Sequence, residues 1–141
     1  MSKRHDEVVE RLLARVREKG LKLTPQRMAI VRELATDTSH PTAQELYERL
    51  LPELPTMSFA TVYNTLAALS EAGLCATRAL TRGPLRFDPN TELHDHAVCD
   101  GCGRVMDVRR MRAGAPDSLG GFQVRAVERI YRGLCADCST H

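Results

Sequence analysis

Two cysteine pairs carry the strongest chemical signal in this 141-residue chain: Cys99-x-x-Cys102 and Cys135-x-x-Cys138. Four thiolates that converge on one ion suit zinc, which favours a closed tetrahedral sulfur site in structural roles. The gap between the pairs is longer than in the shortest zinc ribbons, so the pairs belong to separate elements. We therefore predict a structural zinc site that fastens the last residues to the middle of the chain.

The same cysteines permit two other readings, two redox-active pairs or two disulfides. Disulfides are disfavoured in the cytosol, and the chain shows neither a signal peptide nor a long apolar run. We therefore expect a cytoplasmic protein without a membrane segment. The fifth cysteine, Cys75, lies in an apolar stretch, where a small buried residue is expected and a reactive thiol is the alternative.

A second group of candidate ligands combines imidazoles with carboxylates. In a strand, His94 and His96 point to the same face, so both can bind one metal ion. The full candidate set is His40, Asp88, His94, His96 and Asp107. These donors suit Fe(II), Mn(II) or Zn(II), and bind more reversibly than four thiolates, as a sensor requires. Taken singly, His40 is also compatible with a turn histidine and Asp88 with a turn former.

Four helices must precede these strands. Residues 6–19 form an amphipathic stripe, and Thr24-Pro25 combines an N-cap with a proline at the first helical position. Thr42-x-x-Glu45 is a capping box that begins the third helix. Ser58 caps the fourth helix, which extends to about Ala72.

The fourth helix has an outer face without lysine. Val62, Leu66 and Leu69 share its apolar face, whereas the opposite face carries Ala60, Tyr63, Asn64, Ala67 and Glu71. An amide and small residues suit the DNA major groove, where asparagine can read adenine and apolar groups can contact thymine methyls. A helical domain whose fourth helix packs against a partner protein is the alternative.

Two short strands, 74–80 and 85–88, follow the fourth helix, with Arg82 near the tip of their turn. Three helices, a recognition helix and a hairpin predict a winged helix-turn-helix over residues 1–88. Residues 89–141 form a second small unit, with strands expected at 94–98, 104–108 and 122–127 and a loop or short helix at 113–121. The predicted fold class is therefore α+β. The net charge of +2 requires any basic patch to be local.

Several motifs resemble the ferric uptake regulator (Fur) family, in order along essentially the whole chain. They are Leu23-Thr24-Pro25-Gln26-Arg27, His40-Pro41-Thr42-Ala43, Ser58-Phe59-Ala60-Thr61-Val62-Tyr63-Asn64, Arg86-Phe87-Asp88, His94-Asp95-His96-Ala97-Val98-Cys99-Asp100-Gly101-Cys102-Gly103 and Cys135-Ala136-Asp137-Cys138. The resemblance implies a homodimeric, metal-responsive repressor with an N-terminal winged helix and a C-terminal dimerisation domain. Its partner would be a double-stranded, palindromic, A/T-rich DNA operator.

The resemblance also implies roles for individual residues. Structural Zn(2+) would be bound by Cys99, Cys102, Cys135 and Cys138. Regulatory Fe(2+) or Mn(2+) would be bound by His40, Asp88, His94, His96 and Asp107. The expected DNA contacts are Lys22, Ser58, Thr61, Tyr63, Asn64 and Arg82, with Lys22 approaching the minor groove.

Two residues resemble the peroxide-sensing (PerR) branch of that family, Asp107 in place of a glutamate and Asn64 after Tyr63. In that branch Fe(II) and peroxide oxidise a ligand histidine, for which His40 and His94 are the candidates. An iron, manganese or zinc uptake regulator without peroxide sensing is the alternative, because His94-Asp95-His96 is equally typical of those regulators. No histidine stands at Ala126-Val127, where relatives often have an additional metal site.

Enzyme functions fit the sequence less well. A catalytic zinc needs an open coordination position, and the four cysteines fill all four. The chain contains no His-Glu-x-x-His motif and no deaminase signature. We therefore expect that the protein is not an enzyme. A zinc enzyme and a CxxC redox module are the remote alternatives.

Overall fold

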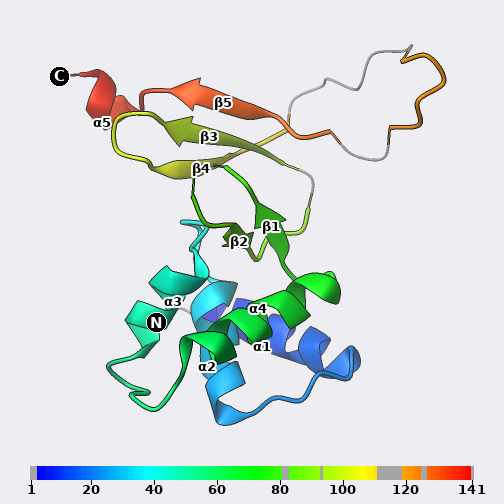
Figure 1. Cartoon of the computed structure of the whole chain (residues 1–141), viewed down its shortest axis with the longest axis vertical. Coiled ribbons are helices and arrows are strands. Elements are labelled where there is room, and N and C mark those ends of the chain that lie inside the picture. Colours follow the sequence, from blue (N-terminus) through cyan, green and yellow to red (C-terminus); the bar gives the residue numbers. More distant parts are fainter. Residues whose placement is uncertain (1–2, 81–82, 93, 111–118, 125–126, 141) are drawn as a thin grey trace. The chain divides into compact units, whose positions relative to one another are not determined.

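The computed structural model describes residues 3–80, 83–92, 94–110, 119–124 and 127–140. The chain divides into two compact units, Met1–Thr91 and Glu92–His141, and each contains its own sheet (Figure 1). The mixed α+β class predicted from the sequence is confirmed. In the described ranges, no helix combines the length and the apolar character that crossing a membrane would need.

Four helices build the first unit, and their starts follow the predicted caps. They are α1 (Lys3–Glu18), α2 (Pro25–Ala35), α3 (Ala43–Leu50) and α4 (Phe59–Glu71). The Thr24 side chain accepts a hydrogen bond from the Arg27 backbone N–H, and Ser58 accepts one from Thr61. Thr42 forms the complete capping box with Glu45. Only α1 departs clearly from the prediction, because it begins three residues earlier than residue 6.

The apolar stripes of these helices meet in one core. Leu13, Ile30, Leu34, Leu46 and Leu66 come from all four helices and are fully buried. On α4 the predicted face is buried: Val62, Leu66 and Leu69 lie in the core. Of the predicted outer residues, Ala60, Tyr63, Asn64 and Glu71 are exposed, whereas Ala67 is half-buried. The core therefore fixes which face of α4 is left for a partner.

A short antiparallel hairpin completes the first unit. Strands β1 (Ala76–Arg78) and β2 (Arg86–Asp88) pair with Ala76 opposite Asp88. Both strands are shorter than predicted. On its other side, β2 contacts the segment before α3, where Thr42 forms a bridge with Arg86 and the Phe87 N–H donates to the Pro41 carbonyl at 2.8 Å. Strand β2 is thus held between β1 and the loop that enters α3.

The second unit is a three-stranded sheet with the order β4-β3-β5. Strand β3 (Asp95–Cys99) pairs antiparallel with β4 (Val105–Val108) and parallel with β5 (Ile130–Gly133). The short helix α5 (Ala136–Ser139) follows β5. Because β3 and β5 are parallel, their carboxyl ends lie at the same edge of the sheet, with Cys99 opposite Gly133.

The predicted strand at 122–127 is wrong for the described residues 122–124 and 127, and β5 lies further along the chain. Residues 119–122 form a turn in which the Phe122 N–H donates to the Leu119 carbonyl. Phe122 is 72% exposed. The alternation of residue types near Phe122 predicted a strand, but the strand that pairs with β3 is instead Ile130–Gly133. The predicted loop at 113–121 lies largely outside the described residues, and Gly120 and Gly121 have positive φ.

Candidate metal centres and DNA-binding face

The four cysteine sulfurs of the second unit form one cluster. All four Sγ atoms lie within 4.8 Å of one another, and those of Cys102 and Cys135 are 3.9 Å apart. Zinc–sulfur bonds of about 2.3 Å in a tetrahedron place sulfurs about 3.8 Å apart, whereas a disulfide needs about 2.05 Å. None of these cysteines forms a disulfide. The cluster therefore has the size of a zinc site.

Parallel pairing of β3 and β5 explains why these cysteines meet. Cys99 ends β3, and Cys135 follows β5 at the same edge of the sheet. The backbone N–H groups of Cys102 and Cys135 both donate to the Cys99 Sγ atom, at 3.5 and 3.3 Å. Gly103 has a φ of 77°, which lets the chain turn back so that its N–H donates to the Cys99 carbonyl at 2.9 Å.

The pKa values of the clustered cysteine thiols also favour the binding of a cation. The backbone N–H of Cys135, followed by that of Cys102, lowers the pKa of Cys99 to about 6. Hydrogen bonds with the other three cysteine side chains, that of Cys135 first, raise the pKa of Cys138 to about 12. Four thiolates this close repel one another, so a positive charge among them favours loss of the remaining protons. A divalent ion supplies that charge, and its binding releases protons.

Two histidines and an aspartate form a second cluster in the same unit. The Nε2 atoms of His94 and His96 lie 3.0 and 3.5 Å from Oδ1 of Asp107. His96 is directly opposite Asp107 in the β3–β4 register, and the two imidazole centroids are 4.5 Å apart. The Nδ1 atom of His94 is 2.7 Å from the Glu92 carbonyl. Donation from Nδ1 leaves the Nε2 lone pair facing the carboxylate, an arrangement that a bound cation stabilises.

The first unit contains a separate pair of candidate ligands. Nε2 of His40 lies 3.3 Å from Oδ2 of Asp88, and each residue is 1% exposed. Oδ2 of Asp88 is also 3.6 Å from Nε of Arg78, while its Oδ1 accepts the N–H of Asn90 at 2.9 Å. His40 has a φ of 57°, the single positive value among the described non-glycine residues. One imidazole and one carboxylate are suitable donors for Fe(II), Mn(II) or Zn(II).

No histidine stands at the position that the family resemblance links to an additional metal site. Ala126 lies outside the described residues, and the carbonyl of its neighbour Val127 accepts a hydrogen bond from Arg110. Arg110 and Arg129 both pair with the buried carboxylate of Asp95, at 3.2 and 3.5 Å. Two guanidinium groups therefore neutralise this carboxylate.

The outward face of α4 combines aromatic and amide groups. Tyr63 is 48% and Phe59 41% exposed, and their ring centroids are 6.3 Å apart. Tyr47 packs edge-on against Phe59, with centroids 5.9 Å apart. Asn64 is exposed beside them. The sequence prediction omitted Phe59, although its i,i+4 spacing from Tyr63 puts the two rings side by side.

The other predicted DNA contacts lie in turns and caps. Lys22 is exposed between α1 and α2, and its carbonyl accepts a hydrogen bond from Arg27 at 3.0 Å. Ser58 and Thr61 stand at the start of α4, with their hydroxyl oxygens 2.9 Å apart. Arg82 lies outside the described residues.

A family model described as "Ferric uptake regulator family" matches residues 18–115. The chain belongs to the ferric uptake regulator family. Members of this family are transcriptional regulators, so the zinc-enzyme alternative is excluded. Regulators of the ferric uptake regulator family bind DNA and are dimeric.

Three relatives illustrate the similarity within the ferric uptake regulator family. The peroxide-responsive repressor PerR of Staphylococcus epidermidis is 34% identical over 94% of this chain and 91% of its own length. A zinc-bound manganese uptake regulator is 27% identical, with a TM-score of 0.69 over 91% of this chain and 98% of that one. PerR from Streptococcus pyogenes, solved to explain peroxide sensing and gene regulation, is 28% identical, with a TM-score of 0.55 over 93% and 92%.

Proposed function

We propose that this protein is a cytoplasmic, metal-dependent DNA-binding repressor whose affinity for its operator is set by Fe(II) or Mn(II). The observation that carries the proposal is the His40–Asp88 pair, with its two ligating atoms 3.3 Å apart in the first unit. That pair belongs to the same unit as the exposed face of α4. Metal binding to these side chains therefore acts on the unit that would contact DNA.

The regulatory ion would bind ligands from both units. Residues 92–141 supply His94, His96 and Asp107, and residues 1–91 supply His40 and Asp88. Five nitrogen and oxygen donors suit Fe(II) or Mn(II) in a five- or six-coordinate site. An ion that binds all five would restrict the relative orientation of the two units. A coupling free energy of about 3 kcal/mol between metal and DNA would change operator affinity about 150-fold.

The cysteine cluster would bind zinc as a structural ion. In the second unit, His96 and Asp107 lie on paired strands and His94 directly precedes β3. Cys99 ends β3, and the other three cysteines lie in the segments that follow β3 and β5. A unit of this size gains much of its stability from a metal staple. We therefore assign Zn(II) to Cys99, Cys102, Cys135 and Cys138 and the dimerisation role to residues 89–141.

The DNA contacts would come from α4 and its surroundings. Tyr63 and Asn64 would enter the major groove, with Ser58 and Thr61 at the helix start. Lys22 would approach the minor groove. Arg82, near the tip of the predicted hairpin turn that forms the wing, would contact the DNA backbone. A homodimer places two such faces on a palindromic operator, for which we propose A/T-rich half-sites.

The deciding experiment is selection of binding sites from a random duplex library by the zinc-loaded protein in the presence of Mn(II). The selected duplex is then titrated separately with protein containing Mn(II), Fe(II), Zn(II) in excess, or no added regulatory ion. We expect a palindromic site and a metal-dependent gain in affinity of about 150-fold at most. Selection of the same site with equal affinity without regulatory metal would contradict the proposal.

Two variants separate the roles of the two metals. Cys102→Ser should lose zinc together with the fold of the second unit, since a structural zinc contributes directly to folding. His96→Ala should keep its zinc, its fold and its dimeric state but lose the response to Mn(II). Metal analysis, circular dichroism and light scattering report these properties independently. Identical behaviour of the two variants would refute this division of roles.

We further propose that iron makes the protein a peroxide sensor, as the 34% identity with peroxide-responsive repressors favours. Iron bound at this site would supply the redox chemistry by which hydrogen peroxide transfers one oxygen atom to a ligand imidazole, while the other oxygen leaves as water. His40 and His94 are the candidates. Peptide mass spectrometry after peroxide treatment, with Fe(II) and Mn(II) samples compared, tests this. An iron, manganese or zinc uptake regulator is the second candidate, supported by the manganese uptake regulator among the solved relatives, and it would show no oxidised histidine.

A further inference from the structure

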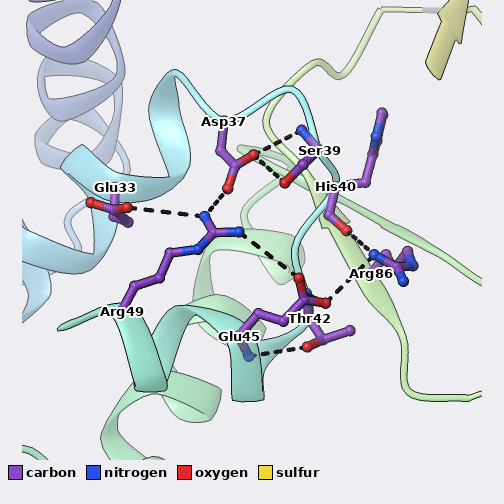
Figure 2. A network of polar contacts seen from close by, with 8 residues as sticks. All are labelled: Glu33, Asp37, Ser39, His40, Thr42, Glu45, Arg49 and Arg86. Atoms are coloured by element: carbon purple, nitrogen blue, oxygen red, sulfur yellow. Dashed lines mark hydrogen bonds and ion pairs between the residues drawn. The ribbon is translucent and has the colours of Figure 1, made fainter. Parts of the chain in front are cut away.

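We propose that Arg86 is a positioning residue for the regulatory metal, because its guanidinium holds the backbone of His40 where the imidazole faces Asp88. This inference rests on the proposed function of the His40–Asp88 pair. The Nη1 atom of Arg86 donates to the His40 carbonyl at 3.0 Å, across 46 positions of sequence (Figure 2). Arg86 itself does not have to bind the metal.

The backbone register explains why Arg86 occupies this place. Thr42 forms an antiparallel bridge with Arg86, and the Phe87 N–H donates to the Pro41 carbonyl. His40 and Asp88 lie two residues beyond this bridge on the two segments, where Nε2 of His40 is 3.3 Å from Oδ2 of Asp88. Residues two apart on a strand share a face, so Arg86 and Asp88 lie on one face of β2. The same short strand thus carries one metal ligand and the group that fixes the backbone of the other.

His40 needs such a support because its backbone is in the left-handed region, with a φ of 57°. A residue with a Cβ atom disfavours this conformation, which persists only where surrounding contacts determine it. The hydrogen bond from Arg86 is made to the carbonyl of this same residue. Without it, His40 can rotate about its N–Cα bond toward a negative φ, which would turn the imidazole away from Asp88.

Arg86 is itself held by α3. Its Nη1 atom lies 3.6 Å from Oε1 of Glu45, and the same oxygen accepts the Thr42 N–H at 3.4 Å in the capping box. Figure 2 shows the resulting path from the His40 carbonyl through Arg86 to the first turn of α3. Helix α3 packs against α4, which carries the proposed DNA-binding face. The backbone of a metal ligand is therefore connected to the helix pair that would contact DNA.

A second arginine in the network provides a matched control. Arg49 pairs with Asp37, whose Oδ1 accepts the Ser39 N–H at 2.7 Å (Figure 2). This contact stabilises the same loop, but Arg49 pairs with Glu33, Asp37 and Glu45 rather than with His40. Loss of Arg49 therefore weakens the loop while it leaves the His40 carbonyl bound to Arg86.

The test measures Mn(II) affinity of the full-length, zinc-loaded protein with free Mn(II) followed by electron paramagnetic resonance. Arg86→Gln and Arg86→Lys should each lower the affinity about 10- to 100-fold, the usual effect of losing a group that orients a ligand. Lysine keeps the charge beside Glu45 but cannot reproduce the geometry of a guanidinium donor. Arg49→Gln should lower the melting temperature, because it removes the partner of the largely buried Asp37 side chain. Its Mn(II) affinity should stay within about twofold of the wild type, because Arg86 still binds the His40 carbonyl.

Co(II) absorption spectra give a second readout, since loss of an imidazole ligand changes the intensity of the visible bands. A merely structural Arg86 predicts a lower melting temperature with unchanged Mn(II) affinity and an unchanged Co(II) spectrum in either folded variant, and that result overturns the inference. Asp88→Asn separates the two proposals. If the wild type binds Mn(II) and Asp88→Asn does not, the site stands and only the role of Arg86 is at stake. Unchanged binding in Asp88→Asn would refute the site itself.

Discussion

Gly101 lies so close to Cys138 that a Cβ atom on this glycine would be 3.0 Å from the cysteine Sγ atom. The same Cβ would be 3.2 Å from the Cβ atom of Cys138 and 3.4 Å from a methyl group of Leu134. Since the Cys138 sulfur belongs to the four-cysteine cluster, it cannot move away without leaving the proposed zinc ion. The glycine between the first two cysteines is therefore required by the second pair.

Gly101→Ala should weaken zinc binding about tenfold, which corresponds to about 1.4 kcal/mol, within the usual cost of overpacking. Competition with a chromogenic chelator measures this affinity. Gly133→Ala is the matched control, because nothing lies within 4 Å of the added methyl group. It should bind zinc like the wild type. Equal affinities for both variants would show that the cluster tolerates the added atom.

Cys75 should be inert toward thiol reagents in the folded protein. It is 3% exposed, and burial first, with the charge of Asp88 second, raises its pKa to about 12. At pH 8 the reactive thiolate is therefore almost absent. We expect no labelled cysteine in the zinc-loaded protein, four after chelation and five after denaturation. Labelling of Cys75 before denaturation would contradict the burial.

The same pKa predicts an alkaline loss of stability. Folding raises the pKa of Cys75 from 9.0 to about 12. The contribution of the neutral thiol to the free energy of unfolding is therefore complete below pH 9 and is lost as pH rises toward 12. Between these values stability should fall by up to about 1.4 kcal/mol per pH unit. Cys75→Ala removes this group, so the difference between the two urea-unfolding curves isolates its effect. Parallel pH dependences would show that Cys75 does not contribute.

Asp95 should be a major stabilising residue of the second unit. Its carboxylate is 1% exposed and pairs with Arg110 and Arg129, whose side chains are 24% and 27% exposed. Asp95→Asn removes the buried negative charge that both guanidinium groups face. We expect the free energy of unfolding to fall by about 2 kcal/mol, because partial exposure of the arginines reduces the cost of a broken buried pair. Arg104→Gln is the control, since its pair with Asp137 is exposed and should contribute less than about 0.5 kcal/mol. Zinc-loaded samples unfolded in urea give both values, and comparable losses would argue against a special role for Asp95.

Asp107→Glu should keep metal-dependent DNA binding but reduce the response to peroxide. Asp107 lies opposite His96, and its Oδ1 atom is 3.0 Å from Nε2 of His94. The additional methylene group of glutamate shifts the carboxylate relative to His94 and His96. The environment of the iron therefore changes, although the ligand is still a carboxylate. Operator binding before and after peroxide, with Fe(II) and with Mn(II), checks the prediction. An unchanged peroxide response would remove Asp107 from the argument for the peroxide-sensing branch.

Local features were predictable because they depend on residues close in sequence. The caps at Thr24, Thr42 and Ser58 satisfy backbone N–H groups within one helical turn, so their spacing alone identifies the helix starts. The two Cys-x-x-Cys pairs and the His-x-His pair likewise specify donor type and local direction. The burial of Val62 and the exposure of Tyr63 follow from helical periodicity.

Non-local pairing was decided by the tertiary structure. The sequence pattern placed a strand at 122–127, whereas β3 pairs with Ile130–Gly133, and this parallel register brings Cys135 beside Cys99. No local pattern specifies which of two strand-like segments occupies a free sheet edge, since the choice depends on the path of the intervening chain.

The sequence by itself therefore determined the helices, the family motifs and the kinds of ligand available. Tertiary structure alone decided that Arg86 binds the carbonyl of His40 and that Gly101 contacts Cys138. Both contacts join residues more than thirty positions apart, where strand register and close packing, rather than local propensity, determine which atoms meet.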